Sequence, residues 1–298
     1  MADRTTEQLH PGAAGLHLAA TADVLSRLLD AQIAAVASVR PALPVLGGAA
    51  DAAATALRSG RKLGYAGAGS SGLMALADCL ELWGTFGIPV DRTPMLFAGG
   101  AAALLHMTGN VEDDPSLAAT DLTRADFTKG DLLVCVSASG TTPYTLAVAQ
   151  GAQGAGARII ALSNVAGSAL LAMADFPVFL DTGPEVIAGS TRMGAASAQK
   201  VALNMLSALV GIRLGHVHDG YMVNVVAENA KLTQRAARIV AAISGVDLPT
   251  AHAAMQAAGG AVKPAVLIAL GSTPAQATTM LQTTGGDLSA ALNHPKPL

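Results

Sequence analysis

The sequence predicts an α/β protein: a doubly wound parallel sheet with N-terminal helices and a small C-terminal helical module. Short apolar runs alternate with helical stretches between about residues 62 and 181, which is typical of parallel strands joined by crossover helices. Several of these runs end in glycine and serine, as expected of binding loops at the carboxyl ends of strands. Helix-forming sequence precedes and follows this region.

The elements follow from local pattern. Residues 18–59 predict two helices with a break near Pro41–Gly48, because apolar residues recur at spacings of three and four. The expected strands lie within residues 62–69, 88–100, 130–140, 157–164 and 176–181. One expected helix follows the first of these strands and runs to about residue 83. The others cover residues 143–150, 190–214 and 223–243.

The last 55 residues contain an internal repeat with a period of 26 residues. Six positions recur, namely Gly245, Ala251, Gln256, Gly259, Gly260 and Ala265 as Gly271, Ala277, Gln282, Gly285, Gly286 and Ala291. Each unit reads as a helix, a glycine pair and a short helix, similar to the small ubiquitin-associated type of module. The alternative is that these helices only cap or dimerise the core. The predicted division is residues 1–58 (helical arm), 59–222 (binding domain) and 223–298 (helical region).

Charge and composition exclude some partners and favour another. The 298 residues carry a net charge of −3 and no basic run, which disfavours nucleic acid and anionic membranes. Charged residues make up 13% of the chain, about half the usual quarter. A surface so rich in small residues predicts burial against a second copy, so we expect a homodimer.

The cysteines and the N-terminal residues indicate the cellular compartment in which we expect the protein. Cys79 and Cys135 both fall in apolar segments, which predicts buried free thiols in a reducing compartment. The first residues lack the apolar core of a signal peptide. We find no unbroken apolar run near the roughly 20 residues that a membrane span requires, and expect a cytoplasmic protein.

The segment "GAGSSG" has the spacing of a dinucleotide-binding loop. Gly67, Gly69 and Gly72 follow an expected strand and precede a helix, and Asp91 lies 19 residues further on. Nicotinamide binding is therefore one interpretation. Ser70 and Ser71 favour another, because two hydroxyls at a helix start suit a single phosphate.

Two further hydroxyl clusters support the phosphate. One follows the expected strand near residue 136 and the other opens the long helix at 190. Simple helix capping is the alternative for any one cluster, but three together predict a phosphate-ester pocket. The predicted binding residues are Gly69, Ser70, Ser71, Ser137, Ser139, Thr141, Thr142, Ser190, Thr191 and Arg192.

These loops, with "GPEVIAGSTRMGAASAQKVALNML", resemble the sugar isomerase (SIS) domain superfamily. Within it they resemble the N-acetylmuramic acid 6-phosphate etherases. "MVNVVAENAKL" and the N-terminal "TEQL" fit the same family. The resemblance implies a SIS-type, flavodoxin-like fold, and a homodimer whose active site lies near the interface. It also implies cofactor-free removal of a lactyl ether from the sugar phosphate.

The resemblance also implies two catalytic glutamates. "ELWGTFG" places the first at Glu81, and the "ED" pair after "AGG" places the second at Glu112. Elimination across C2 and C3 needs a base and an acid, which two carboxylates with separated pKa values provide. Apolar neighbours predict burial and a raised pKa for Glu81, which makes it the better proton donor.

Three positions depart from the family pattern. Leu73 and Thr141 stand where etherases carry arginine, and Gly194 where they carry lysine. These losses predict altered recognition of the second anion and leave the exact sugar open. A phosphosugar aldose–ketose isomerase and a non-catalytic sugar-phosphate sensor are the alternatives. Three histidines are further candidates for ring opening, namely His106, His216 and His218.

Overall fold

The computed structural model describes residues 5–106 and 109–293. The chain divides into two compact units, which we describe separately. One comprises residues 1–79 with 91–209, and the other residues 80–90 with 210–298. The predicted three-part division, with boundaries at 58 and 222, stays a prediction.

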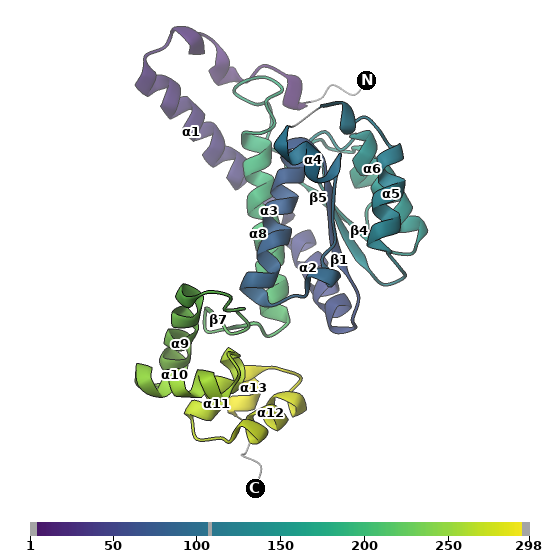
Figure 1. The fold of residues 1–298 in the computed structure, drawn as a ribbon. Coiled ribbons are helices and arrows are strands. Elements are labelled where there is room, and N and C mark those ends of the chain that lie inside the picture. The colour runs from purple at the N-terminus through teal and green to yellow at the C-terminus, as the bar shows by residue number, and fades with distance from the viewer. Residues whose placement is uncertain (1–4, 107–108, 294–298) are drawn as a thin grey trace. The chain divides into compact units, whose positions relative to one another are not determined.

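A five-stranded parallel sheet forms the centre of the first unit (Figure 1). The strands are β1 (Leu63–Gly67), β2 (Met95–Phe97), β3 (Leu132–Val136), β4 (Arg158–Ser163) and β5 (Phe176–Phe179). They lie in the order β2-β1-β3-β4-β5, and every neighbouring pair is parallel. All five strands were predicted from the sequence. The order reverses between β1 and β3, and open α/β sheets bind ligands at such a switch point.

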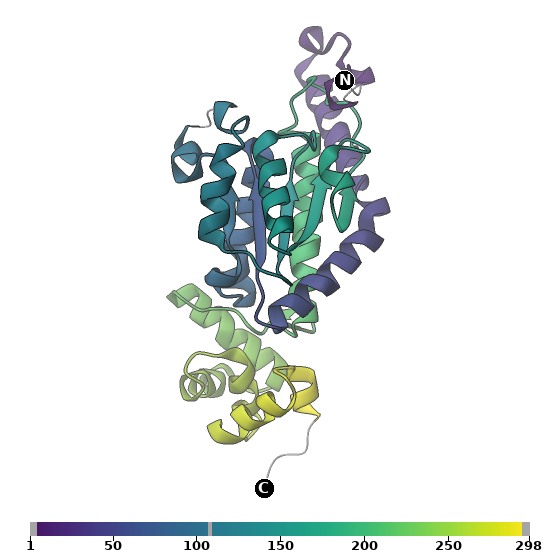
Figure 2. The same ribbon diagram turned by 90° about the vertical axis from the view of Figure 1, so that its right-hand side faces the viewer.

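Helices cover both faces of this sheet, as a doubly wound fold requires (Figures 1 and 2). Those on one face include α5 and α6, whereas α2, α3 and α8 lie on the other. The helices of this part of the chain are α1 (Thr21–Ala37), α2 (Leu43–Arg58), α3 (Gly69–Phe86), α4 (Gly100–Leu105), α5 (Ser116–Ala125), α6 (Pro143–Gly154), α7 (Ala169–Ala172) and α8 (Gly194–Arg213). Short 3-10 turns include Thr5–Glu7, Arg40–Ala42 and Gly109–Val111.

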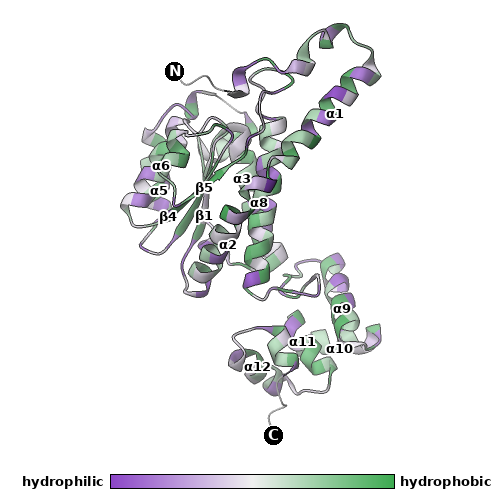
Figure 3. Cartoon of the chain, turned by 180° about the vertical axis from the view of Figure 1, so that it is seen from behind, coloured by the Kyte–Doolittle hydropathy of each residue, from purple (hydrophilic) through white to green (hydrophobic). Residues whose placement is uncertain are grey.

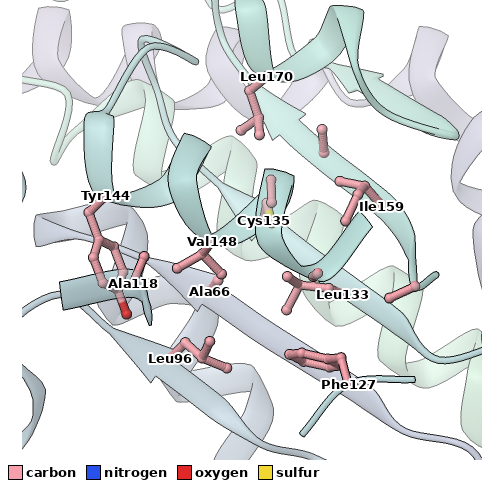
Figure 4. Packing of buried hydrophobic residues seen from close by; sticks show 14 of the residues in the cluster. Ala66, Leu96, Ala118, Phe127, Leu133, Cys135, Tyr144, Val148, Ile159 and Leu170 are labelled. Carbon is pink, nitrogen blue, oxygen red and sulfur yellow. The ribbon is translucent and has the colours of Figure 1, made fainter. Parts of the chain in front are cut away.

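The core between the sheet and helices α5 and α6 consists mainly of small and branched side chains (Figure 4). Leu133 and Ile159 from neighbouring strands pack there with Val148 of α6. Tyr144 is fully buried and donates its hydroxyl to Asp121 Oδ2 at 2.6 Å. Parallel strands buried on both faces read as continuous apolar runs, which is why the sequence pattern located them.

A buried carboxylate ties the other face of the sheet to its helices. Asp78 of α3 is 2% exposed and accepts from Tyr65 of β1 at 3.0 Å. It also accepts from Asn204 and Ser207 of α8, at 2.8 and 2.9 Å. Burial raises the pKa of Asp78, although these hydrogen bonds oppose the shift. The network fixes α3, which begins at the predicted binding loop.

The second unit contains a helical repeat. Its elements are β6 (Val217–His218), β7 (Tyr221–Met222), α9 (Ala230–Ser244), α10 (Leu248–Ala257), α11 (Val262–Ala269), α12 (Pro274–Thr283) and α13 (Leu288–Leu292). Asp247 and Thr273 cap the starts of the equivalent helices α10 and α12. Helix, glycine pair and short helix therefore recur as predicted, and their apolar faces share one core.

Some predicted boundaries were wrong. The break between the first two helices covers residues 38–42, and α2 continues through Gly47 and Gly48 because Pro44 lies in its first turn, where proline is tolerated. The long helix α9 begins at Ala230, not Val223, because Val223 and Val225 are buried in a turn and the irregular segment that follows it.

Both cysteines are free and buried, as predicted. Burial raises the pKa of Cys79 to about 12 and that of Cys135 further. Two helical stretches, residues 21–58 and 194–213, are long and apolar enough to span a membrane by length and composition. The second stretch contributes buried residues to the core of the first unit, and core helices of soluble proteins meet the same criteria of length and composition. Figure 3 shows hydrophobic and hydrophilic residues mixed along α1.

Candidate phosphosugar site

A cavity of about 400 Å³ lies at the carboxyl ends of the central strands, at the point where the strand order reverses. Gly67 of β1 pairs with Val136 of β3, so the loops that follow these strands are neighbours. The cavity is lined by Thr6, Glu7, Ala68, Gly69, Ser70, Ser71, Phe97, Ala98, Ala103, Val111, Glu112, Ala138, Ser139, Thr142, Gly189 and Thr191. Residues far apart in the sequence thus share one pocket.

The first loop approaches the sheet through two glycines. A Cβ added to Gly72 would lie 2.7 Å from the ring of Phe97 and 2.9 Å from the backbone of Gly67. Only glycine allows α3 to begin so close to the strand. The start of α3 places Gly69, Ser70 and Ser71 on the cavity wall. Free amides and a positive dipole end at a helix start favour an anion.

The hydroxyls of the second loop bond to one another. Ser137 Oγ lies 2.8 Å from Thr142 Oγ1 and 3.4 Å from Ser139 Oγ, and it accepts from Gly140 N at 3.0 Å. Thr142 is the N-cap residue of α6, yet its side chain makes no capping hydrogen bond. Helix capping therefore does not account for this hydroxyl, and Thr142 lines the cavity.

A hydrogen bond connects the first two loops. Ala138 N donates to Ser71 Oγ at 3.3 Å, and this hydroxyl is buried. Thr141 is exposed and donates to Ser139 Oγ from both its backbone and its side chain, at 3.2 and 3.1 Å. The structure thus brings together most predicted hydroxyls of these loops. Ser137 does not line the cavity but hydrogen-bonds to Ser139 and Thr142, which do. Thr141 also lies outside the lining.

The third loop differs from its prediction. Long helix α8 begins at Gly194, so Ser190 and Thr191 do not open it. The buried carboxylate of Glu185 accepts from Gly194 N and Ala195 N instead, at 2.9 and 2.8 Å. Thr191 lines the cavity, whereas Ser190 and the exposed Arg192 do not.

Glu112 reaches the cavity from the loop between α4 and α5. It is half-buried, and its carbonyl accepts from Tyr144 N at 3.1 Å, which fixes the loop to the start of α6. Burial raises the pKa of the Glu112 carboxyl, and the neighbouring charge of Asp113 raises it further. A carboxyl with this shift suits proton transfer nearer neutral pH.

Glu81 does not line the cavity, and its predicted burial was wrong. It is exposed on α3, twelve residues beyond Gly69, which corresponds to about 18 Å along a helix axis. Leu80 beside it is 64% exposed, whereas Leu82 is 1% exposed. Helical rotation of 100° per residue turns Leu80 and Glu81 outward and Leu82 inward, so apolar sequence neighbours did not mean an apolar environment.

None of the three positions that depart from the family pattern, namely Leu73, Thr141 and Gly194, lines the cavity. No lysine, arginine or histidine lines it within residues 5–106 and 109–293. Leu73 is half-buried on α3. A side chain at Gly194 would meet Glu185 Oε2 at 3.0 Å and Ala35 at 3.2 Å. Close packing of α1 against the start of α8 therefore accompanies the loss of lysine at this position.

The histidines that the sequence analysis considered for ring opening lie outside the cavity lining. None of the three predicted histidines lines the cavity, and His218 Nδ1 lies 2.8 Å from Ser289 Oγ in the second unit. No group of three or more metal-ligating side chains occurs among the described residues. Thr6 and Glu7 line the cavity but were not predicted. Their family-like "TEQL" motif was the only signal available in the sequence.

Comparison with known proteins agrees with this architecture. The SIS domain family model matches residues 31–164. A putative phosphosugar isomerase involved in capsule formation from Bacteroides fragilis has a TM-score of 0.51 at 22% identity, covering 68% of this chain and 95% of its own. A phosphoheptose isomerase from Francisella tularensis has a TM-score of 0.50 at 20% identity, covering 65% and 100%. These likenesses confirm the fold.

Curated relatives match over nearly the full length. The N-acetylmuramic acid 6-phosphate etherase of Deinococcus radiodurans is 42% identical, covering 99% of this chain and 97% of its own. The enzyme of the same name from Streptomyces avermitilis is 39% identical over 97% and 93%, and that from Bacillus subtilis 34% over 98% and 97%. This chain belongs to the N-acetylmuramic acid 6-phosphate etherase family.

Proposed function

We propose that the protein cleaves the lactyl ether of N-acetylmuramic acid 6-phosphate, giving N-acetylglucosamine 6-phosphate and D-lactate in the cytoplasm. The observation that carries this proposal is one cavity lined by two hydroxyl loops and Glu112. The loops offer hydroxyl and amide donors to a phosphate, while the carboxylate offers acid–base chemistry. The names of the full-length relatives supply the substrate.

In the proposed reaction the 6-phosphate binds at the starts of α3 and α6. The contacting residues would be Gly69, Ser70, Ser71, Ser139 and Thr142, with Ser137 positioning Thr142. Of the remaining predicted residues, Thr191 also lines the cavity, and Thr141, Ser190 and Arg192 would act only from outside the lining. Binding energy from the distant phosphate orients C2 and C3 for reaction.

Glu112 acts as the base in this proposal. Once the sugar ring opens, the C1 aldehyde acidifies the C2 proton, and the raised pKa of Glu112 makes it a stronger base for that proton. The C3–oxygen bond then breaks, and an acid protonates the departing lactate oxygen. Water adds at C3 while a proton returns to C2, so that one water is consumed for each ether cleaved.

Glu81 is the proposed acid, acting from a second copy of the chain. Its exposed position on α3, next to the exposed Leu80, suits an interface better than its own cavity. An exposed apolar stripe on α1, formed by Leu25, Leu29 and Ile33, also suits a partner subunit. A homodimer with shared active sites would bring Glu81 of one copy to Glu112 of the other.

Mixing two inactive variants tests this arrangement. Glu81→Gln and Glu112→Gln homodimers should each release almost no D-lactate from N-acetylmuramic acid 6-phosphate. If the two carboxylates come from different copies, random exchange gives mixed dimers with one intact site, and about a quarter of wild-type activity returns. No recovery after verified subunit exchange would contradict the shared site.

The sensor alternative keeps one specific observation in its favour, the absence of a cation from the described lining. Wild-type protein incubated with N-acetylmuramic acid 6-phosphate separates the two functions. The etherase releases D-lactate and N-acetylglucosamine 6-phosphate in equal amounts. Binding of the sugar phosphate in calorimetry without any lactate would support the sensor and refute the etherase.

A further inference from the structure

The 3-10 turn Thr5–Glu7 forms part of the cavity wall. Thr6 is 2% exposed, and its carbonyl accepts from Gly189 N at 3.1 Å. Both Thr6 and Glu7 line the cavity. They are far from Ser139 in the sequence but share its pocket. The turn is therefore held against the loop that precedes α8.

Glu7 brings a second carboxylate into the cavity. The residue is exposed, and its side chain makes no hydrogen bond or ion pair with any other residue in the described part of the chain. An ionised carboxylate only accepts hydrogen bonds, and it repels a phosphate or a second carboxylate. The groups of a sugar phosphate that it suits are the neutral donors, the hydroxyls and the amide N–H.

Gly189 leaves the space that Glu7 occupies. A Cβ at this position would lie 2.7 Å from Glu7 Oε2, closer than real Cβ contacts. Gly189 also has a φ of +73°, which disfavours other residues. The same glycine thus anchors Thr6 through its amide and accommodates the carboxylate of Glu7.

We propose that Glu7 is a substrate-contacting specificity residue whose carboxylate accepts hydrogen bonds from the neutral donors of the sugar. The proposal rests on the proposed function, because it assumes a phosphosugar bound with its phosphate on the hydroxyl loops. Glu7 then orients the sugar from the Thr5–Glu7 turn, and Glu112 remains the base. The pocket favours ligands with donors at this end and disfavours ligands with a second anion there.

Calorimetry with N-acetylglucosamine 6-phosphate and with inorganic phosphate tests the contact. Glu7→Gln should weaken sugar phosphate binding at least about tenfold, as loss of a charge-assisted hydrogen bond does. It should leave inorganic phosphate affinity unchanged or slightly increased. In turnover KM should rise by a similar factor with kcat within a few-fold. Asp23→Asn, at an exposed acid on α1, is the control for charge alone.

Unchanged sugar phosphate affinity in Glu7→Gln would overturn the proposal, as would a fall in kcat without a rise in KM. Equal losses for sugar phosphate and phosphate would also overturn it. Because binding is measured separately, absence of lactate release from wild-type protein refutes the etherase without deciding the Glu7 contact. Absence of all binding by the wild type refutes both.

A pair of glycine variants supplies an independent test. Gly189→Ala should weaken sugar phosphate binding by displacing Glu7, whereas Gly183→Ala should not. Gly183 also has a positive φ, +65°, but nothing lies within 4 Å of its Cβ position. In a Glu7→Ala background, Gly189→Ala should cost little further affinity. An undiminished effect in that background would show that Gly189 does not act through Glu7.

Discussion

Gly72→Ala should destabilise the protein and weaken phosphosugar binding. The added methyl would lie 2.7 Å from Phe97 Cε2 and 2.9 Å from two backbone atoms of Gly67. The backbone cannot yield as a flexible side chain does, so either α3 shifts from β1 or the Phe97 ring moves. Phe97 itself lines the cavity, and both movements alter the phosphate loop.

The expected magnitude combines two opposing effects. Overpacking costs about 1–3 kcal/mol, while replacing glycine within a helix returns about 0.5–1 kcal/mol. A net loss of about 1–2 kcal/mol corresponds to a fall in Tm of roughly 2–8 °C for a unit of this size. Affinity for N-acetylglucosamine 6-phosphate should fall in the same variant, because Ser70 and Ser71 belong to the displaced turn.

Gly47→Ala is the matched control. Gly47 lies in α2 of the same unit, and nothing occupies the 4 Å around its Cβ position. This substitution should raise Tm slightly and leave sugar phosphate binding unchanged, in thermal denaturation and calorimetry on both variants. If Gly72→Ala melts at or above the wild-type temperature, or binds the sugar phosphate equally well, the close approach of α3 to β1 does not shape the site.

Three further outcomes follow from the structure. Glu112→Gln should lower kcat by about 10²–10⁴-fold with little change in sugar phosphate affinity, and a kcat near wild type would remove Glu112 as the base. Asp113→Asn should lower the pKa of Glu112, because the charge of Asp113 helps to raise that pKa. The acidic limb of the kcat/KM profile should therefore move to lower pH, and an upward shift or no shift would contradict this. The pKa of Asp78 is raised in the folded protein, so the native state binds more protons than the unfolded state. The free energy of unfolding should therefore fall as pH rises from about 4 through that pKa. Asp78→Asn should flatten this pH dependence in denaturant titrations, and an unchanged slope would assign the dependence to other groups.

The sheet could be predicted because its central strands β1, β3 and β4 are buried on both faces and stand out as short apolar runs. The hydroxyl loops could be predicted because glycine and serine follow these strands directly. The boundary errors have local physical causes. Glu185 caps α8 from nine residues before Gly194, and Val223 is buried in a turn although its apolar pattern suggested helix.

The carboxylates show the limit of reasoning from neighbours in the sequence. Glu81 has apolar residues on both sides, but helix rotation exposes it. Glu112 stands among polar residues, yet tertiary packing half-buries it and raises its pKa. Glu7 enters the cavity through a contact with Gly189, 182 positions away. No periodicity encodes contacts of such separation, and the family-like "TEQL" motif does not specify the partner of Glu7.

A crystal structure with bound N-acetylglucosamine 6-phosphate is the most direct test of the shared phosphosugar cavity. The proposed function predicts the phosphorus at the starts of α3 and α6, with its oxygens within about 3 Å of the hydroxyls of Ser71, Ser139 and Thr142. The carboxylate of Glu112 should then face C2. A phosphate bound away from both hydroxyl loops, or a sugar whose C2 faces away from Glu112, would contradict it.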